Sequence, residues 1–425
     1  MKVGDFLYEQ FLQILREELR PAMGCTEPIA LAYAGAKARE LLGGLPDRVV
    51  LEVSGNIIKN VKSVVVPNTG GQHGLAAALC AGIVAGDASR ELQVISAITP
   101  EQQVQLRQYM DQVDLTIRPA ASGIVFDIDV TLFRSGDRVR LRIANHHTNI
   151  VRMEKNDRIL LDRPVEEASE DQLTDKSCLT IERIVAFADC LDTSHVEDSV
   201  GEQIRCNLEI AEEGLRSSWG ANIGSVILAR QGQSLSKRAC AYAAAGSDAR
   251  MSGCEKPVMI VSGSGNQGIT ASVPVAIYAQ QLGLPREKLL KAVALSDLVT
   301  IHQKAGIGRL SAYCGAISAG CGAGAGIAYL CGGGLDAVAH TVVNAIAILS
   351  GTICDGAKAS CAAKIAAAVD AGILGYDMYL ENQQFCSGDG IVTKGADKTV
   401  YNVGRLAREG MRETDKTILE IMMTP

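Results

Sequence analysis

Five cysteines lie close together in the last third of the chain: Cys314, Cys321, Cys331, Cys354 and Cys361. Cys314 and Cys321 are seven residues apart, as are Cys354 and Cys361, and seven residues make two turns of an α-helix. Each pair is therefore expected on one helix face. Three or four thiolates suit a soft metal centre such as zinc or iron–sulfur. Structural packing is the alternative, because free cysteine behaves as a small hydrophobic residue and the chain has no CxxC motif.

A second segment whose residues could take part in chemistry is Gly24-Cys25-Thr26-Glu27-Pro28. Proline favours the first turn of a helix, and Thr26 or Glu27 would cap that turn. Cys25 is then expected at a helix N-terminus, where free amides lower the pKa of a thiol and attract a carboxylate. The alternative is a capping turn in which the cysteine has no chemical role.

Three short glycine-containing loops each carry an asparagine. They are Ser54-Gly55-Asn56, Pro67-Asn68-Thr69-Gly70-Gly71 and Ser264-Gly265-Asn266-Gln267-Gly268. Glycine lets the backbone approach a ligand, and an amide side chain both donates and accepts hydrogen bonds. Asn56, Asn68 and Asn266, together with Thr26, are therefore candidates for binding a small-molecule amino-acid substrate. The few histidines form no HExxH motif, and packing or surface roles are expected for most of them.

The amino-acid composition argues against several classes of partner and indicates the cellular setting. A net charge of −7 without a basic run argues against nucleic acid and anionic membrane as partners. Thirteen cysteines, an odd number, and no signal-peptide pattern indicate a reducing, cytoplasmic setting. The weakly charged stretch 310–353 is rich in Ala, Gly and Ser, which favours buried helices over a membrane span. Such long apolar helices are compatible with a homodimer.

The residue patterns predict an α+β protein, with an inserted α/β-sandwich-like domain and a large all-helical, Gly/Ala-rich domain. We expect residues 1–45 to form N-terminal helices that pack on the helical domain. Residues 46–155 are predicted to form an α+β domain with a mixed or antiparallel sheet, and 156–425 the helical, cluster-binding domain. Strand-like alternation marks 48–54, 61–67, 115–119, 124–133 and 139–144, of which the last two form a hairpin. Helices are expected near 4–19, 28–42, 74–84, 180–190, 202–217, 234–246, 268–283, 286–303, 310–330, 336–350 and 358–372.

Taken together, the Gly-Cys-Thr-Glu-Pro segment, the asparagine loops and the Cys314/Cys354/Cys361 spacing resemble the iron–sulfur L-cysteine desulfidases. These are related to the iron–sulfur L-serine dehydratases, and the resemblance covers about residues 5 to 410. It implies a [4Fe–4S] cluster held by Cys314, Cys354 and Cys361, with one iron open to substrate. The chain ends Ile-Met-Met-Thr-Pro, without the cysteine-bearing tail of serine dehydratases. Cys25 is therefore expected as the fourth ligand at rest or as the catalytic base. Glu27, Lys59 and a histidine are the alternatives for the base.

The resemblance implies an α,β-elimination that converts L-cysteine and water to hydrogen sulfide, ammonia and pyruvate. L-Serine is the alternative substrate for the same chemistry. A pyridoxal-phosphate dehydratase is a second alternative, because Lys237 and the loop 262–268 superficially resemble a lysine and phosphate-loop pair. A non-catalytic iron–sulfur redox or scaffold protein is the third.

Overall fold

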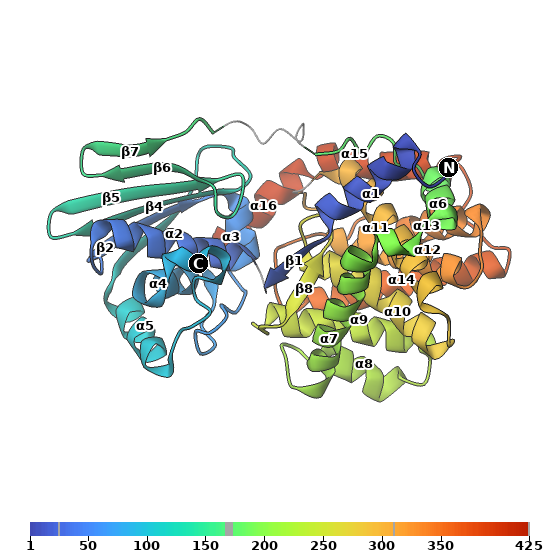
Figure 1. Ribbon diagram of the computed structural model, residues 1–425, viewed down its shortest axis with the longest axis horizontal. Helices are drawn as coiled ribbons and strands as arrows, with labels where there is room; N and C mark the ends of the chain where they lie inside the picture. Colours follow the sequence, from blue (N-terminus) through green and yellow to red (C-terminus); the bar gives the residue numbers. More distant parts are fainter. Residues whose placement is uncertain (24–25, 166–172, 309–310, 424–425) are drawn as a thin grey trace.

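The computed structural model describes residues 1–23, 26–165, 173–308 and 311–423. The chain folds into two lobes that lie side by side (Figure 1). We call the first the sheet lobe, which contains the elements from α2 to β7. The second is the helical lobe, which contains α1, β1 and the elements from α6 to α15. Each lobe has its own large hydrophobic core.

The sheet lobe is built on a mixed sheet of six strands in the order β3-β2-β4-β5-β6-β7 within the described residues. The strands are β2 (Arg48–Val53), β3 (Asp114–Pro119), β4 (Asp127–Arg134), β5 (Asp137–Ala144), β6 (Ile150–Lys155) and β7 (Arg158–Asp162). Its helices are α2 (Thr26–Leu42), α3 (Gly55–Val61), α4 (Gly74–Ala85), the 3-10 helix η1 (Ala88–Gln93) and α5 (Pro100–Gln112). Only β2 and β3 pair in parallel.

Alternation along the strands separates the two faces of this sheet. Alternate residues of β4, such as Ile128 and Val130, are fully buried in the core shared with α2 and α4. On β5, Arg140 and Arg142 form bidentate pairs with Asp129 and with another β4 aspartate, Asp127. A register shift of one residue would exchange these ion pairs with the core side chains, so the pattern fixes the register.

The helical lobe begins with α1 (Phe6–Glu18), and β1 (Arg20–Met23) pairs antiparallel with β8 (Pro257–Ile260). Its helices are α6 (Ile181–Cys190), η3 (Thr193–His195), η4 (Glu197–Gly201), α7 (Glu202–Arg216), α8 (Ile223–Gln231), α9 (Leu235–Met251), α10 (Gly265–Gln281), α11 (Arg286–Ile307), α12 (Gly315–Leu330), α13 (Leu335–Leu349), α14 (Cys361–Leu380), α15 (Ala396–Arg405) and η5 (Leu406–Gly410). The last helix, α16 (Arg412–Met423), returns to pack on α3 of the sheet lobe (Figure 1).

Small residues let α12 and α14 pack with their backbones almost in contact. A Cβ on Gly324 would lie 2.4 Å from the carbonyl oxygen of Gly372, and one on Gly320 would lie 2.4 Å from that of Ala368. The contact passes from Gly320 and Ala368 to Gly324 and Gly372, so the residue numbers of both helices increase in the same direction and the helices run parallel. Their N-termini, next to Cys314 and at Cys361, therefore lie at the same end of the helical lobe.

The α+β class predicted from sequence is confirmed, with a mixed sheet and a large helical portion. The hairpin of β4 and β5 is also confirmed. The segment 61–67 is not a strand, because only an isolated bridge joins Val65 to His73. Sequence reasoning also missed α3, α5, β6, β7, α8, α15 and α16.

The first 45 residues divide between the lobes. Helix α1 packs in the helical core, whereas α2 packs in the core of the sheet lobe.

The apolar stretch 310–353 contains α12 and α13, most of whose residues are buried. In the part of the chain that the structure describes, no helix combines the length and apolarity needed to cross a membrane.

A buried carboxyl group lies deep in the helical lobe, where α7, α10 and α11 meet. Asp297 is fully buried, and its Oδ1 accepts a hydrogen bond of 2.9 Å from Gln203 Nε2. Asp297 Oδ2 and Gln203 Oε1 have no partner among the described residues. Burial raises the pKa of Asp297 from 3.8 to about 8, opposed by the hydrogen bond from Gln203. A protonated carboxyl supplies the donor that these two acceptors lack.

This carboxyl makes stability depend on pH. Because its pKa is higher in the folded than in the unfolded state, its contribution is complete below about pH 4. It is lost progressively as the pH rises toward 8. In urea titrations, Asp297→Asn should flatten the decline in the free energy of unfolding between pH 5 and 8. Asp336→Asn, at an exposed position, is the control and should keep the wild-type slope. Equal slopes in all three proteins would contradict the assignment.

Candidate active site at the lobe interface

Cys314 and Cys354 are brought together by a short antiparallel contact between two loops. A bridge joins Tyr313 to Ile353, and the Cys314 amide donates to the Thr352 carbonyl at 3.0 Å. The Cys314 thiol in turn donates a hydrogen bond to the Cys354 thiol. Cys361, the first residue of α14, is close enough to interact electrostatically with both. The structure therefore gathers the three cysteines that the family resemblance selected.

The helical reading of the cysteine spacing was wrong. Cys354 lies in the loop before α14, so it does not share a helix with Cys361. Cys314 precedes α12, whereas Cys321 lies inside that helix and donates to the Val342 carbonyl at 3.6 Å. Cys331 is an exposed residue at the far end of α12. A loop bridge and two helix starts, rather than helical periodicity, gather the three thiols.

Three lysine side chains lie near the three thiols. The hydrogen bond from Cys314 lowers the pKa of Cys354 to about 5, and the Gly356 amide, Lys59 and Lys364 act in the same direction against burial. Burial lowers the pKa of Lys304, whereas the thiols of Cys354 and Cys314 raise it. The hydrogen bond with Cys354 and burial raise the pKa of Cys314, and burial raises the pKa of Cys361. The surrounding therefore favours negative charge on Cys354.

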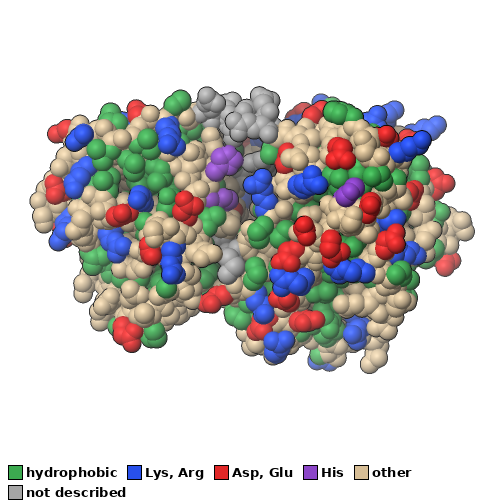
Figure 2. All heavy atoms as spheres, in the orientation of Figure 1, with side chains coloured by type: hydrophobic (Ala, Val, Ile, Leu, Met, Phe, Trp, Pro, Cys, Tyr) green, Lys and Arg blue, Asp and Glu red, His purple; other side chains and the backbone are tan. Residues whose placement is uncertain are grey.

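Both lobes contribute to this surrounding. Lys59 belongs to α3 of the sheet lobe, and its carbonyl lies so close to Gly356 that a Cβ there would be 2.0 Å from it. Cys361 packs against Val64 of the sheet lobe and Met251 of the helical lobe. The cysteines thus lie at the lobe interface, a boundary along which His and Lys or Arg side chains gather in Figure 2.

Predicted residues of the sheet lobe form a polar group on α2 and α3. Asn60 Nδ2 donates to Glu27 Oε1 at 3.2 Å and to Asn56 Oδ1 at 3.4 Å. The Thr26 hydroxyl donates to Glu27 Oε2 at 3.3 Å. Thr26 and Asn56 are therefore brought together through Glu27, an alternative base named from the sequence, and through Asn60, which the sequence did not indicate. Cys25, the predicted catalytic residue, lies outside the described residues and directly precedes Thr26 in the sequence.

His147 was assigned to packing or surface from the sequence, but it lies near this polar group. Its ring packs edge-on against Phe126, with the ring centroids 4.7 Å apart. Burial lowers the pKa of His147, whereas the nearby Glu27 raises it. The His146-His147 pair is visible in the sequence, but only the fold places it beside Glu27.

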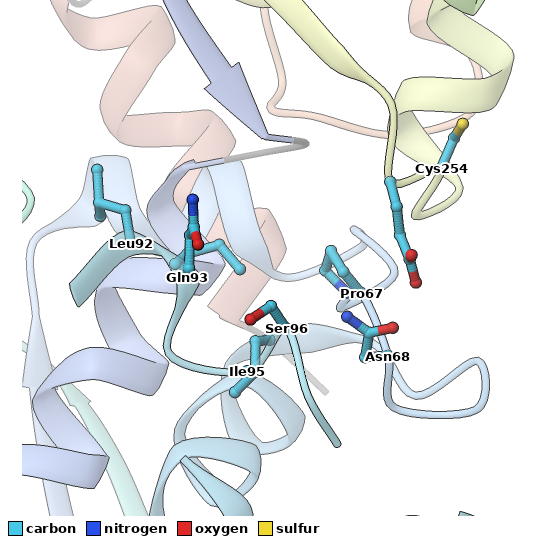
Figure 3. A pocket seen from close by; sticks show the side chains of 9 residues that line it. Pro67, Asn68, Leu92, Gln93, Ile95, Ser96 and Cys254 are labelled. Carbon is cyan, nitrogen blue, oxygen red and sulfur yellow. The ribbon is translucent and has the colours of Figure 1, made fainter. Parts of the chain in front are cut away.

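Asn266 and Asn68 occupy different surroundings. Asn266 lies in the first turn of α10, where its Oδ1 accepts a hydrogen bond of 3.2 Å from Arg250. Asn68 lines a cavity of about 190 Å³ that also includes Ser96 and, from the helical lobe, Cys254 (Figure 3). Among the described residues, no hydrogen bond joins Asn68 to the three cysteines or to the polar group around Glu27.

A family model described as the serine dehydratase alpha chain matches residues 89–420. A UPF0597 protein of Desulfitobacterium hafniense is 55% identical and aligns with 100% of this chain and 98% of its own length. UPF0597 proteins of Lachnoclostridium phytofermentans and Treponema denticola are 45% and 42% identical; they align with 98% and 100% of this chain and with their full lengths. The chain therefore belongs to the serine dehydratase alpha-chain family.

Proposed function

We propose that this protein is a carbon–sulfur lyase, an L-cysteine desulfidase, with a [4Fe–4S] cluster held by Cys314, Cys354 and Cys361. The observation that carries the proposal is the meeting of three thiols from two chain segments beside Lys59, Lys304 and Lys364. Membership of the serine dehydratase alpha-chain family supports a lyase reaction on a small amino acid.

The chemistry of the site fits an iron–sulfur cluster. Cysteine thiolates are the ligands such clusters use, and the lysines offset the negative charge that the thiolates bring. Among the described residues, no three or more His, Cys, Asp or Glu side chains form a set that could hold a metal ion as they stand. In a four-iron cluster each thiolate binds a different iron, so its ligands need not converge on one point.

The proposed reaction is an α,β-elimination. A base takes the Cα proton, the Cβ–S bond breaks, and its electron pair leaves with sulfur. The aminoacrylate that remains isomerises to an imine, and water releases ammonia and pyruvate. When bound, the cluster would supply an open iron as a Lewis acid for the leaving sulfur. Cys25 is the proposed base, and Thr26, Asn56, Asn68 and Asn266 are the proposed substrate-binding residues.

L-Serine is the alternative substrate of the same site, because hydroxyl and thiol differ little in size. The softness of sulfur favours L-cysteine at iron.

For the pyridoxal alternative, Lys237 would have to lie near the loop 262–268. Lys237 pairs instead with Asp370 at 2.7 Å. It precedes Arg250, which contacts that loop, by about 20 Å along α9 at ~1.5 Å per residue.

The proposal includes a reducing, cytoplasmic location. All cysteines that the structure describes are free thiols, and many are buried in the helical core. An oxygen-sensitive cluster would need the same reducing conditions.

The decisive experiment is anaerobic reconstitution with iron and sulfide, followed by assays of L-cysteine and L-serine in parallel. We expect pyruvate and sulfide in equal amounts from L-cysteine, with activity lost in air. A higher kcat/KM for L-serine would identify a serine dehydratase. Pyruvate from neither substrate would favour a non-catalytic redox or scaffold protein, and a pyridoxal absorbance without iron would favour the rival cofactor.

Replacing any one of the proposed ligands should release the cluster. Cys314→Ser, Cys354→Ser and Cys361→Ser should each lose most of the bound iron and reduce pyruvate formation to background. Cys321→Ser is the matched control, since Cys321 is a buried cysteine of α12 with a separate partner, and it should retain iron and activity. Full iron content in the three variants, measured chemically and by the visible spectrum, would refute the ligand assignment.

The proposed base is tested separately. Cys25→Ala should lower kcat by about 100- to 10,000-fold with little loss of iron, because a general base contributes in that range. Cys386→Ala, which removes an exposed thiol, should behave as wild type. Loss of the cluster in Cys25→Ala would make Cys25 a ligand at rest instead of a base.

A further inference from the structure

Arg250, at the C-terminal end of α9, is a buried cation without an acidic partner among the residues that the structure describes. The residue is only 7% exposed, and the one hydrogen bond it makes among the described residues runs from Nη1 to Asn266 Oδ1, a neutral acceptor. No salt bridge to it occurs within the described ranges, and its Nε has no partner there. A buried guanidinium is costly unless an anion compensates it.

The guanidinium lies across the N-terminus of α10. A Cβ added to Gly265, the first residue of this helix, would be 2.3 Å from Arg250 Nε. The Ser264 hydroxyl caps this turn by accepting a hydrogen bond of 3.4 Å from the Gln267 amide. The amides of Gly265 and Asn266 have no partner within the helix, and together with the dipole they favour an anion. Gln267, in the same turn, is 6% exposed, and its Oε1 also has no partner among the described residues.

Two contacts connect this position with the cysteines. A Cβ on Gly315, the residue after Cys314, would lie 2.8 Å from the Gln267 side chain. Met251, the residue after Arg250, packs with Val64 and Cys361. The cation and the helix N-terminus therefore lie next to the proposed cluster ligands on two sides.

We propose that Arg250 and the N-terminus of α10 bind the α-carboxylate of the amino-acid substrate. This inference rests on the proposed function and deepens it, since it identifies the group that selects free amino acids over their amides and amines. A guanidinium can hold a carboxylate with two parallel hydrogen bonds, and the anion would neutralise the buried charge. Asn266 holds the guanidinium in position, and Gly265 leaves room for it.

The test measures binding and turnover on anaerobically reconstituted enzyme. L-Alanine has the carboxylate and ammonium but no leaving group, so calorimetry gives its affinity without reaction. Arg250→Gln should weaken L-alanine binding and raise the KM for L-cysteine by about 10- to 100-fold, since hydrogen bonds to charged groups contribute on that scale. The iron content and the affinity for L-alaninamide should stay at wild-type values, and Arg250→Lys should recover part of the loss.

Arg238→Gln is the matched control. It removes an arginine of the same helix whose Nε is also unpartnered, and it should leave both constants unchanged. If Arg250→Gln does not fold by circular dichroism, Gly265→Ala is the second variant. Its methyl group displaces the guanidinium but keeps its charge, and it should raise the KM in the same way.

Failure of this inference differs from failure of the proposed function. Wild-type turnover of L-cysteine together with L-alanine binding that is insensitive to Arg250→Gln would overturn the carboxylate site alone. Arg250-dependent binding of L-alanine to a protein that forms no pyruvate would support the site and overturn the elimination. Equal loss of L-alanine and L-alaninamide binding would also overturn the inference, because the carboxylate would then not be the group recognised.

Discussion

The close parallel packing of α12 on α14 is the constraint on which the site depends. Gly324 and Gly372 leave no room for a side chain between the two backbones, and this contact aligns the two helix starts. Cys314 and Cys361 lie at those starts, and the Tyr313–Ile353 bridge adds Cys354. A wider contact would move the two N-termini apart, so the thiol site depends on this packing.

The thiols also explain why the lobes meet where they do. Negative sulfur in a buried place needs nearby positive charge, and the helical lobe supplies Lys304 and Lys364. The sheet lobe supplies Lys59, which is buried and pairs with Asp415 of α16. The C-terminal helix thus holds a lysine of one lobe close to the cysteines of the other, and the site is complete only when both lobes are in contact.

Local patterns were sufficient for much of the fold. Alternation in β4 and β5 predicted their hairpin, and apolar periodicity predicted most helices of the helical lobe. Short or polar elements were not predicted, because their stability comes from partners that are distant in the sequence. Helix α8, for example, starts where Asp248 of α9 accepts a hydrogen bond of 3.1 Å from the Gly224 amide. The choice of Cys314 over Cys321 came from family resemblance, since spacing treats the two alike.

The remaining site residues could not be found from spacing, because what distinguishes them is a missing partner. Arg250 looks like any arginine near the end of an alanine-rich helix. What distinguishes Arg250 is that it is buried without a counter-charge among the described residues and that its guanidinium lies against Gly265 of another helix. Asn266 was predicted as a candidate from the composition of its loop, whereas no pattern in the sequence indicated its hydrogen-bond partner Arg250 on α9. A buried charge in contact with a helix N-terminus is therefore more informative here than motifs, since leaving a buried cation without a counter-charge is costly unless a ligand compensates it.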